Sequence, residues 1–315
     1  TLFRSLPVGR RTMRLAAANV LIASFVAAAP ALACTICVDP PERTTVDHVV
    51  AARDVVLARE DPARPFRFAP VEVLRGSAEG PPIPFLVDST LRRRLAAEPN
   101  TAVLFTRGAG SGGWKRLRVV SPVMRPILDD VRARGHDWLR PSGARERFEA
   151  FAALHDHVDP AVRSLALAEL DRTPWRLLRT LEKRLPGARL RASLDRPSEL
   201  PWTSVRLRLL ALDPGPEDVA FLRARLDGKA GAGGALHLDA LAIAIVEIDG
   251  TQGIDRLLAL YGSGTDRSRA ERAAIAKALA THGTDGDPGL RADIAAALGE
   301  LLSADAGLAP EIAVG

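Results

Sequence analysis

The chain has 315 residues, a formal net charge of +5 and only two cysteines. Two cysteines can form at most one disulfide within the chain, which excludes a disulfide-rich scaffold. The hydrophobic core must therefore stabilise a fold of this size. Residues 1–33 carry four arginines and no acidic residue, so the rest of the chain is nearly neutral. Because nucleic-acid binding needs a clustered excess of basic charge, we expect no nucleic-acid partner.

Residues 1–33 have the order of a secretory signal peptide. Their arginines precede an uncharged, alanine-rich run over 15–29. Ala31 and Ala33 then leave small side chains where a signal peptidase cleaves. We therefore expect cleavage before Cys34 and a periplasmic or secreted protein. A transmembrane anchor is the alternative interpretation of the same run.

Cys34 and Cys37 follow this segment directly and are the most reactive side chains in the sequence. The two residues between them allow a small disulfide, a redox thiol pair or half of a metal site. Lipidation of Cys34, as in a lipoprotein, is a further alternative, and it is the one condition under which we expect membrane attachment. Met13 is an alternative start of the chain.

Residues 34–125 are predicted to form a small β-barrel domain. Apolar residues alternate with polar ones in short runs, which is typical of half-buried strands. Helices are expected at 45–52 and 89–97. Five strands are expected, at 55–59, 66–74, 83–87, 102–106 and 115–119.

The start of this region resembles the netrin-like fold, which tissue inhibitors of metalloproteinases share. The resemblance lies in Cys34-Thr35-Ile36-Cys37-Val38-Asp39-Pro40-Pro41, a short helix, and then Asp54-Val55-Val56-Leu57 opening the barrel. It implies a metalloprotease inhibitor in which the amine and carbonyl of Cys34 bind the protease zinc and Thr35 enters the cleft. The family pattern has one residue between the two cysteines, whereas this chain has two.

Residues 126–143 are predicted to be a bracing linker, because prolines and glycines are frequent in and around them. From 144 to 315 the pattern is helical, with pairs of helices that recur every thirty to forty-odd residues. Asp-Pro followed by an arginine opens two of them, at 159–163 and 287–291. These pairs resemble HEAT-like repeats and predict an α-solenoid. The predicted fold class is therefore α+β with two domains, a five-stranded OB-like or netrin-like barrel followed by the solenoid.

The function expected from this architecture is that of a non-enzymatic, exported protein-binding scaffold of the bacterial envelope. Solenoids present long surfaces to partners, and we find no convincing catalytic triad, paired carboxylates or metalloprotease helix, so neither a cofactor nor a metal is expected. A thiol or metal protein acting through Cys34 and Cys37, and the inhibitor acting through Cys34, are the alternatives. Basic helix faces predict a mixed-charge surface for an acidic protein partner, formed by Arg176, Arg179, Lys183, Arg184, Arg223 and Arg225.

Overall fold

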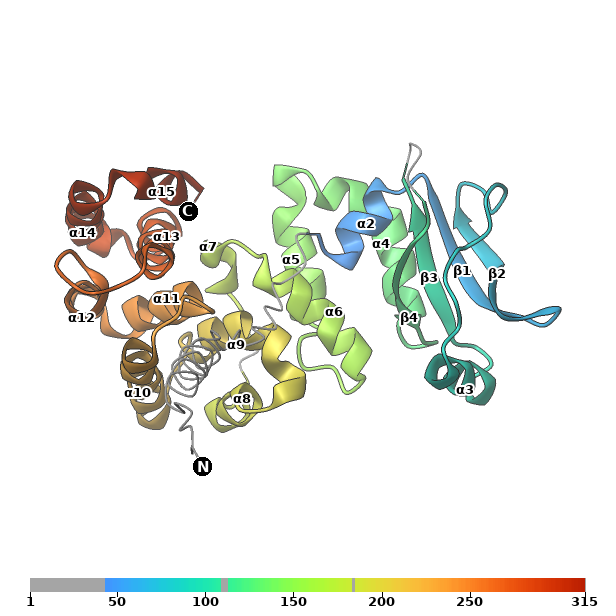
Figure 1. Ribbon diagram of the computed structural model, residues 1–315, viewed down its shortest axis with the longest axis horizontal. Helices are drawn as coiled ribbons and strands as arrows, with labels where there is room; N and C mark the ends of the chain where they lie inside the picture. The colour runs from blue at the N-terminus through green and yellow to red at the C-terminus, as the bar shows by residue number, and fades with distance from the viewer. Residues whose placement is uncertain (1–42, 109–112, 183–184, 315) are drawn as a thin grey trace, which may run out of the picture. The chain divides into compact units, whose positions relative to one another are not determined.

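The computed structural model describes residues 43–108, 113–182 and 185–314, and shows a mixed α+β protein (Figure 1). Its strands form one antiparallel sheet in the order β2-β1-β3-β4. The sheet is open, so the predicted five-stranded barrel is wrong. The predicted cysteine pair and signal peptide lie outside the described residues. The strands are β1 (Asp54–Asp61), β2 (Arg64–Arg75), β3 (Ala102–Arg107) and β4 (Lys115–Val120).

The segment expected as the third of five strands, 83–87, does not join the sheet. A single bridge between Arg67 and Leu86 is its only strand pairing. Pro84 is its second residue and Pro81 and Pro82 precede it, and proline has no N–H group for a strand ladder. Ile83 and Val87 are nevertheless buried and Phe85 is partly buried, whereas Leu86 is exposed, so the apolar pattern reflects packing against the sheet rather than strand pairing.

A hydrophobic core covers each face of the sheet. Successive residues of β1 point to opposite faces and so contribute to different cores. Val56 lies opposite Phe105 of β3 and contributes to a core with helix α3 (Ser89–Ala97). Val55 and Leu57 contribute to a second core, shared with helix α2 (Thr45–Ala51) and with helices further along the chain. The sheet is therefore the middle layer of three.

Asp54 anchors the start of β1 at the turn that follows β2. Its buried carboxylate accepts hydrogen bonds from the Ser77 N–H at 2.9 Å and from the side chains of Arg107 and Arg53 at 2.8 Å. Burial alone would raise the pKa of Asp54, but these hydrogen bonds outweigh it and lower the pKa to about 2. Gly76 is required in this turn, since its φ is +70° and a Cβ would lie 2.3 Å from the Asp54 carboxylate.

The predicted linker at 126–143 largely consists of helix α4 (Arg125–Trp138), which is a core element. Pro126 stands in the first turn, where a helix tolerates proline. Gly135 allows close packing, because a Cβ there would lie 2.4 Å from a methyl group of Val50 on α2. Pro126 and Gly135, which are typical of linkers, thus stand in a helix: the proline lies in its first turn and the glycine allows it to pack closely against α2. The division into two domains at this segment stays a prediction.

The chain after α4 is helical, and its helices pack in rows (Figure 1). One row consists of α6, α9, α11, α13 and α15, each of which contacts the next. In addition, α8 contacts α10, and α12 contacts α14. The helix that begins at Trp175 ends after one turn. The helices are α5 (Ala144–Ala152), α6 (Pro160–Asp171), α7 (Trp175–Leu178), α8 (Gly187–Leu194), α9 (Thr203–Leu210), α10 (Pro216–Ala232), α11 (Leu238–Asp249), α12 (Thr251–Tyr261), α13 (Arg269–Asp285), α14 (Arg291–Ala304) and α15 (Ala309–Val314).

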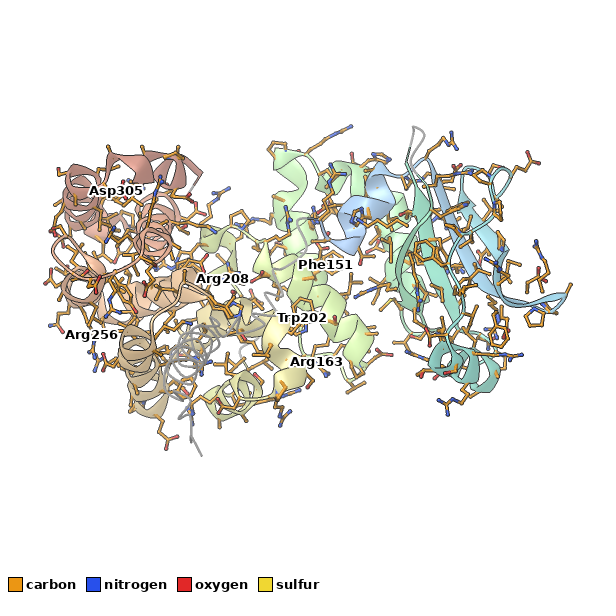
Figure 2. All side chains as sticks on the ribbon, in the orientation of Figure 1. Phe151, Arg163, Trp202, Arg208, Arg256 and Asp305 are labelled. Atoms are coloured by element: carbon orange, nitrogen blue, oxygen red, sulfur yellow. The ribbon has the colours of Figure 1, made fainter. Side chains whose placement is uncertain are left out.

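A buried ion network joins α2 to the helical rows. Arg147 on α5 donates to the Glu169 carboxylate of α6 at 2.6 and 2.8 Å, and to Asp47 of α2 at 2.9 Å. It also donates to the Thr44 hydroxyl, which caps α2 together with Asp47. Apolar contacts also connect these parts of the chain, since Phe151 of α5 belongs to the core that contains residues of the sheet, α2 and α4 (Figure 2). The beginning of the described chain is thus tied to residues about a hundred positions later.

Candidate functional site

A polar groove of about 450 Å³ lies along the row formed by α9, α11 and α13. Its lining comes from the end of α6, from α7 and the residues just before it, from the first two turns of α9 and of α11, and from the second half of α13. Four of the lining residues are apolar: Pro174, Trp175, Ala240 and Ile243. The others are Asp171, Thr173, Arg176, Ser204, Arg208, Asp239, Lys277, Thr281, Thr284 and Asp285.

Three ion pairs line this groove, and each joins two different helices. Arg208 extends from α9 and donates to Asp171 at the end of α6 at 2.7 Å (Figure 2). Lys277 of α13 lies 3.1 Å from Asp239 of α11. The third pair joins Arg176 of α7 to Asp285 of α13 at 2.7 Å. The groove therefore presents three cations and three carboxylates.

The ion pairs differ in how far their side chains reach solvent. Arg208 and Asp171 are nearly buried, whereas the side chains of Arg176 and Lys277 are 60% and 48% exposed. Asp285, the partner of Arg176, is only 9% exposed. One pair is thus enclosed in the wall, while the other two place exposed cations at the rim.

Trp175 forms an apolar part of the groove wall. It is 2% exposed, and its ring packs edge-on against the imidazole of His282, with centroids 5.7 Å apart. Burial lowers the pKa of His282, whose Nε2 contacts the carbonyl oxygen of Ile243 at 2.9 Å. His282 is therefore neutral at pH 7, and the contact is an Nε2–H donating to that carbonyl. This pair holds the wall between α7, α11 and α13.

Ser204 and His237 form a serine–histidine contact at the groove edge. The Ser204 hydroxyl lies 2.8 Å from Nδ1 of His237, which has a positive φ of 58° just before α11. Burial lowers the pKa of His237, so the ring is neutral at pH 7. In a hydrolase triad a carboxylate orients such a histidine. Among the residues that the structure describes, none is hydrogen-bonded to the other nitrogen of this ring.

The residues predicted to bind a partner do not form one surface. Arg176 lies in the groove, and Arg179, at the end of α7, pairs with Glu247 at 3.0 Å. On α10, Arg223 pairs with Asp249 and Arg225 with Asp195. Of the predicted set, the structure therefore places Arg176 at the candidate site. Cys34, Thr35, Cys37, Lys183 and Arg184 lie outside the described residues.

The groove contains residues that the sequence analysis did not single out. Asp171 and Arg208 are 37 positions apart, and Asp239 and Lys277 are 38 apart. These intervals fall within the range of the repeat. A search for opposite charges one repeat apart would have found both pairs, because such residues occupy matching places on neighbouring helices.

No protein-family model matches the chain, and no curated protein or solved structure does either. Its function is therefore inferred from its own geometry. Within the described part of the chain, no helix is long and apolar enough to cross a membrane, and no three His, Cys, Asp or Glu side chains converge as metal ligands. Asp159, which follows His155 and His157 in the sequence, caps α6.

Proposed function

We propose that this protein is a non-enzymatic, exported binding scaffold that holds an acidic segment of a partner protein in the groove along α9, α11 and α13. The observation that carries the proposal is the pair of exposed cations, Arg176 and Lys277, at the rim of a groove lined by successive helices. Pockets for small molecules are mostly apolar, whereas ten of the fourteen residues lining this groove are polar or charged.

An acidic segment would bind by offering its carboxylates to the ion-paired cations at the rim. The exposed pair of Lys277 and Asp239 contributes only about 0 to 1 kcal/mol, so Lys277 loses little when it turns to a carboxylate of another chain. Arg176 can keep its bond to the nearly buried Asp285 and donate its remaining N–H groups to the partner. Arg176 has the more favourable position, because a guanidinium binds a carboxylate through two parallel hydrogen bonds. The hydroxyls of Thr281 and Thr284 add hydrogen-bonding groups on α13.

The alternatives from the sequence depend on other residues. A thiol protein or a metalloprotease inhibitor would act through Cys34, outside the described residues. Export likewise depends on residues 1–33. The groove supports the binding scaffold independently of these, because its charges and its shape come from the helices alone.

Charge reversal at the groove rim tests the proposal. We expect an Arg176→Glu/Lys277→Glu variant to bind the partner captured by the wild-type protein at least tenfold more weakly, because two attractive contacts become repulsive. Captured partner is quantified by mass spectrometry, and the melting temperature is recorded for each variant.

The matched control is Arg223→Glu/Arg256→Glu, which reverses two exposed, ion-paired arginines on α10 and α12 that do not line the groove. The control is expected to capture the partner as the wild type does. Equal capture by the groove variant and the wild type would rule out this groove as the binding site.

A further inference from the structure

A second, smaller cavity lies where the repeated first-turn arginines meet. Arg163 follows the Asp-Pro opening of α6, and Arg206 occupies the corresponding place on α9, which packs against α6. Both arginines line a cavity of about 100 Å³ (Arg163 is labelled in Figure 2). Arg189 of α8 and Arg196, just after α8, line it too. The repeated arginine position and the segment around α8 together bring four guanidinium groups to one small space.

The charge around this cavity is not balanced. Glu199 is the one carboxylate among the residues that line it, and it pairs with Arg206 at 2.5 Å. Arg189 pairs with Asp156 at 2.5 Å, which is not part of the lining. Two arginines, Arg163 and Arg196, therefore face the cavity without a described carboxylate partner. The site has a net charge of about +2 when both acids are counted.

Arg206 shows the effect of this excess most clearly. Its side chain is 6% exposed, and its described hydrogen bonds both go to Glu199, although a guanidinium has five N–H donors. Burial lowers the pKa of the Arg206 guanidinium, and the carboxylate of Glu199 raises it. The positive charges of Arg163 and Arg196 lower this pKa further. An additional anion in the cavity would relieve that repulsion and accept the remaining hydrogen bonds.

We propose that this cavity binds a tetrahedral oxyanion of the phosphate class. Its volume of about 100 Å³ suits one phosphoryl group and is too small for a nucleotide. Guanidinium groups bind phosphate oxygens through paired, charge-assisted hydrogen bonds, and Arg163, Arg196 and Arg206 have donors left for this purpose. Arg163 uses one N–H for the His157 carbonyl oxygen at 2.8 Å, which fixes its side chain at the wall.

The same chemistry has two sources, namely the free ion and a phosphate ester on a larger molecule. Calorimetric titration of the full chain with inorganic phosphate and with phosphoserine separates them, with sodium chloride at matched ionic strength as the background. Tighter binding of phosphate assigns the site to the free ion, and tighter binding of phosphoserine assigns it to an ester. Binding of either supports the proposal.

The variants are chosen so that folding and binding are distinguished. Arg196 is exposed and has no described packing role, so Arg196→Gln should fold normally and bind phosphate about tenfold more weakly, as should Arg163→Gln. Arg291→Gln is the matched control, because Arg291 stands at the same place after an Asp-Pro opening but is exposed and does not line the cavity.

We expect wild-type binding to remain in Arg291→Gln. The proposal is overturned if neither anion binds beyond the chloride background, or if Arg291→Gln weakens binding as much as the two cavity variants do. The partner-binding groove does not share any of these residues, so failure of one site leaves the other untouched.

Discussion

An Arg147→Met variant is expected to lose about 3 to 5 kcal/mol in the free energy of unfolding at pH 7, the range found when one member of a buried ion pair is removed. Arg147 makes both of the described ionic contacts that join α5 to Glu169 and to Asp47. The side chain of Glu169 is 3% exposed, so its carboxylate would stay buried without its cation. Urea denaturation followed by circular dichroism measures the change.

The pH dependence of this variant identifies the cause. Burial already raises the pKa of Glu169 above its ordinary value of 4.5, and Arg147 opposes that rise. Without Arg147 the pKa rises further, and an acid whose pKa is raised in the folded state loses stability as pH rises from its unfolded pKa to its folded one. The deficit of Arg147→Met should therefore shrink as the pH is lowered from 7 towards about 4.5.

Two further variants serve as controls for Arg147. Arg145→Met lies on the same helix, but its side chain is 62% exposed and its ion pair with Glu149 lies on the surface. We expect it to change the free energy of unfolding by less than about 0.5 kcal/mol. Arg147→Met/Glu169→Met should regain most of the loss, because the most deeply buried charge is removed and the remaining carboxylate, Asp47, is 18% exposed. A deficit in Arg147→Met that is independent of pH would contradict the role assigned to Glu169.

Leu241→Ala should lower the free energy of unfolding by about 2 to 5 kcal/mol, as expected for a large-to-small change in a core. Leu241 is 2% exposed on α11, a helix that contacts α9, α10, α12 and α13. Leu302→Ala is the comparison, because Leu302 is partly buried on α14, which has fewer neighbouring helices. We expect the smaller loss there, and equal losses in denaturant titrations would show that stability is not concentrated in the inner helices.

Several elements were predictable because their signals are local. The helix expected at 89–97 is α3, since Asp88 caps it and Leu91 and Leu95 form its buried side. The helix expected at 45–52 is α2, which begins at Thr45, ends one residue earlier than expected and is capped by Thr44. Such segments combine one period of apolar residues with a clear beginning, and no distant partner is needed to specify them.

The errors arose where tertiary contacts decide the structure. The run at 83–87 is apolar and strand-like, but with Pro84 in it the segment packs against the sheet without joining it, so the sheet has four strands and does not close into a barrel. Pro126 and Gly135 look like linker residues until Val50 of α2 is seen against Gly135. A sequence shows that a glycine is present, but it does not show which neighbour requires one.

The candidate site was predictable only in part for the same reason. Arg176 stood out as a basic residue on a helix, yet its partner Asp285 is 109 positions away. Arg223 and Arg225 of α10 have the same local character, but they pair with Asp249 and Asp195, which do not line the groove. The local sequence therefore showed that basic residues lie on these helices. Only the stacking of the helices shows that Arg176, Lys277 and Arg208 line the same groove.

Site-specific photocrosslinking tests the binding groove most directly. A photoreactive phenylalanine analogue at Thr284, an exposed residue of the groove, is compared with one at Glu217 on α10, whose side chain is 84% exposed. Crosslinked peptides from the native envelope are then sequenced by mass spectrometry. We expect position 284 to crosslink one discrete acidic segment of one partner, and position 217 to give no such product. Identical products from both positions, or none from position 284, would contradict a partner-binding groove along α9, α11 and α13.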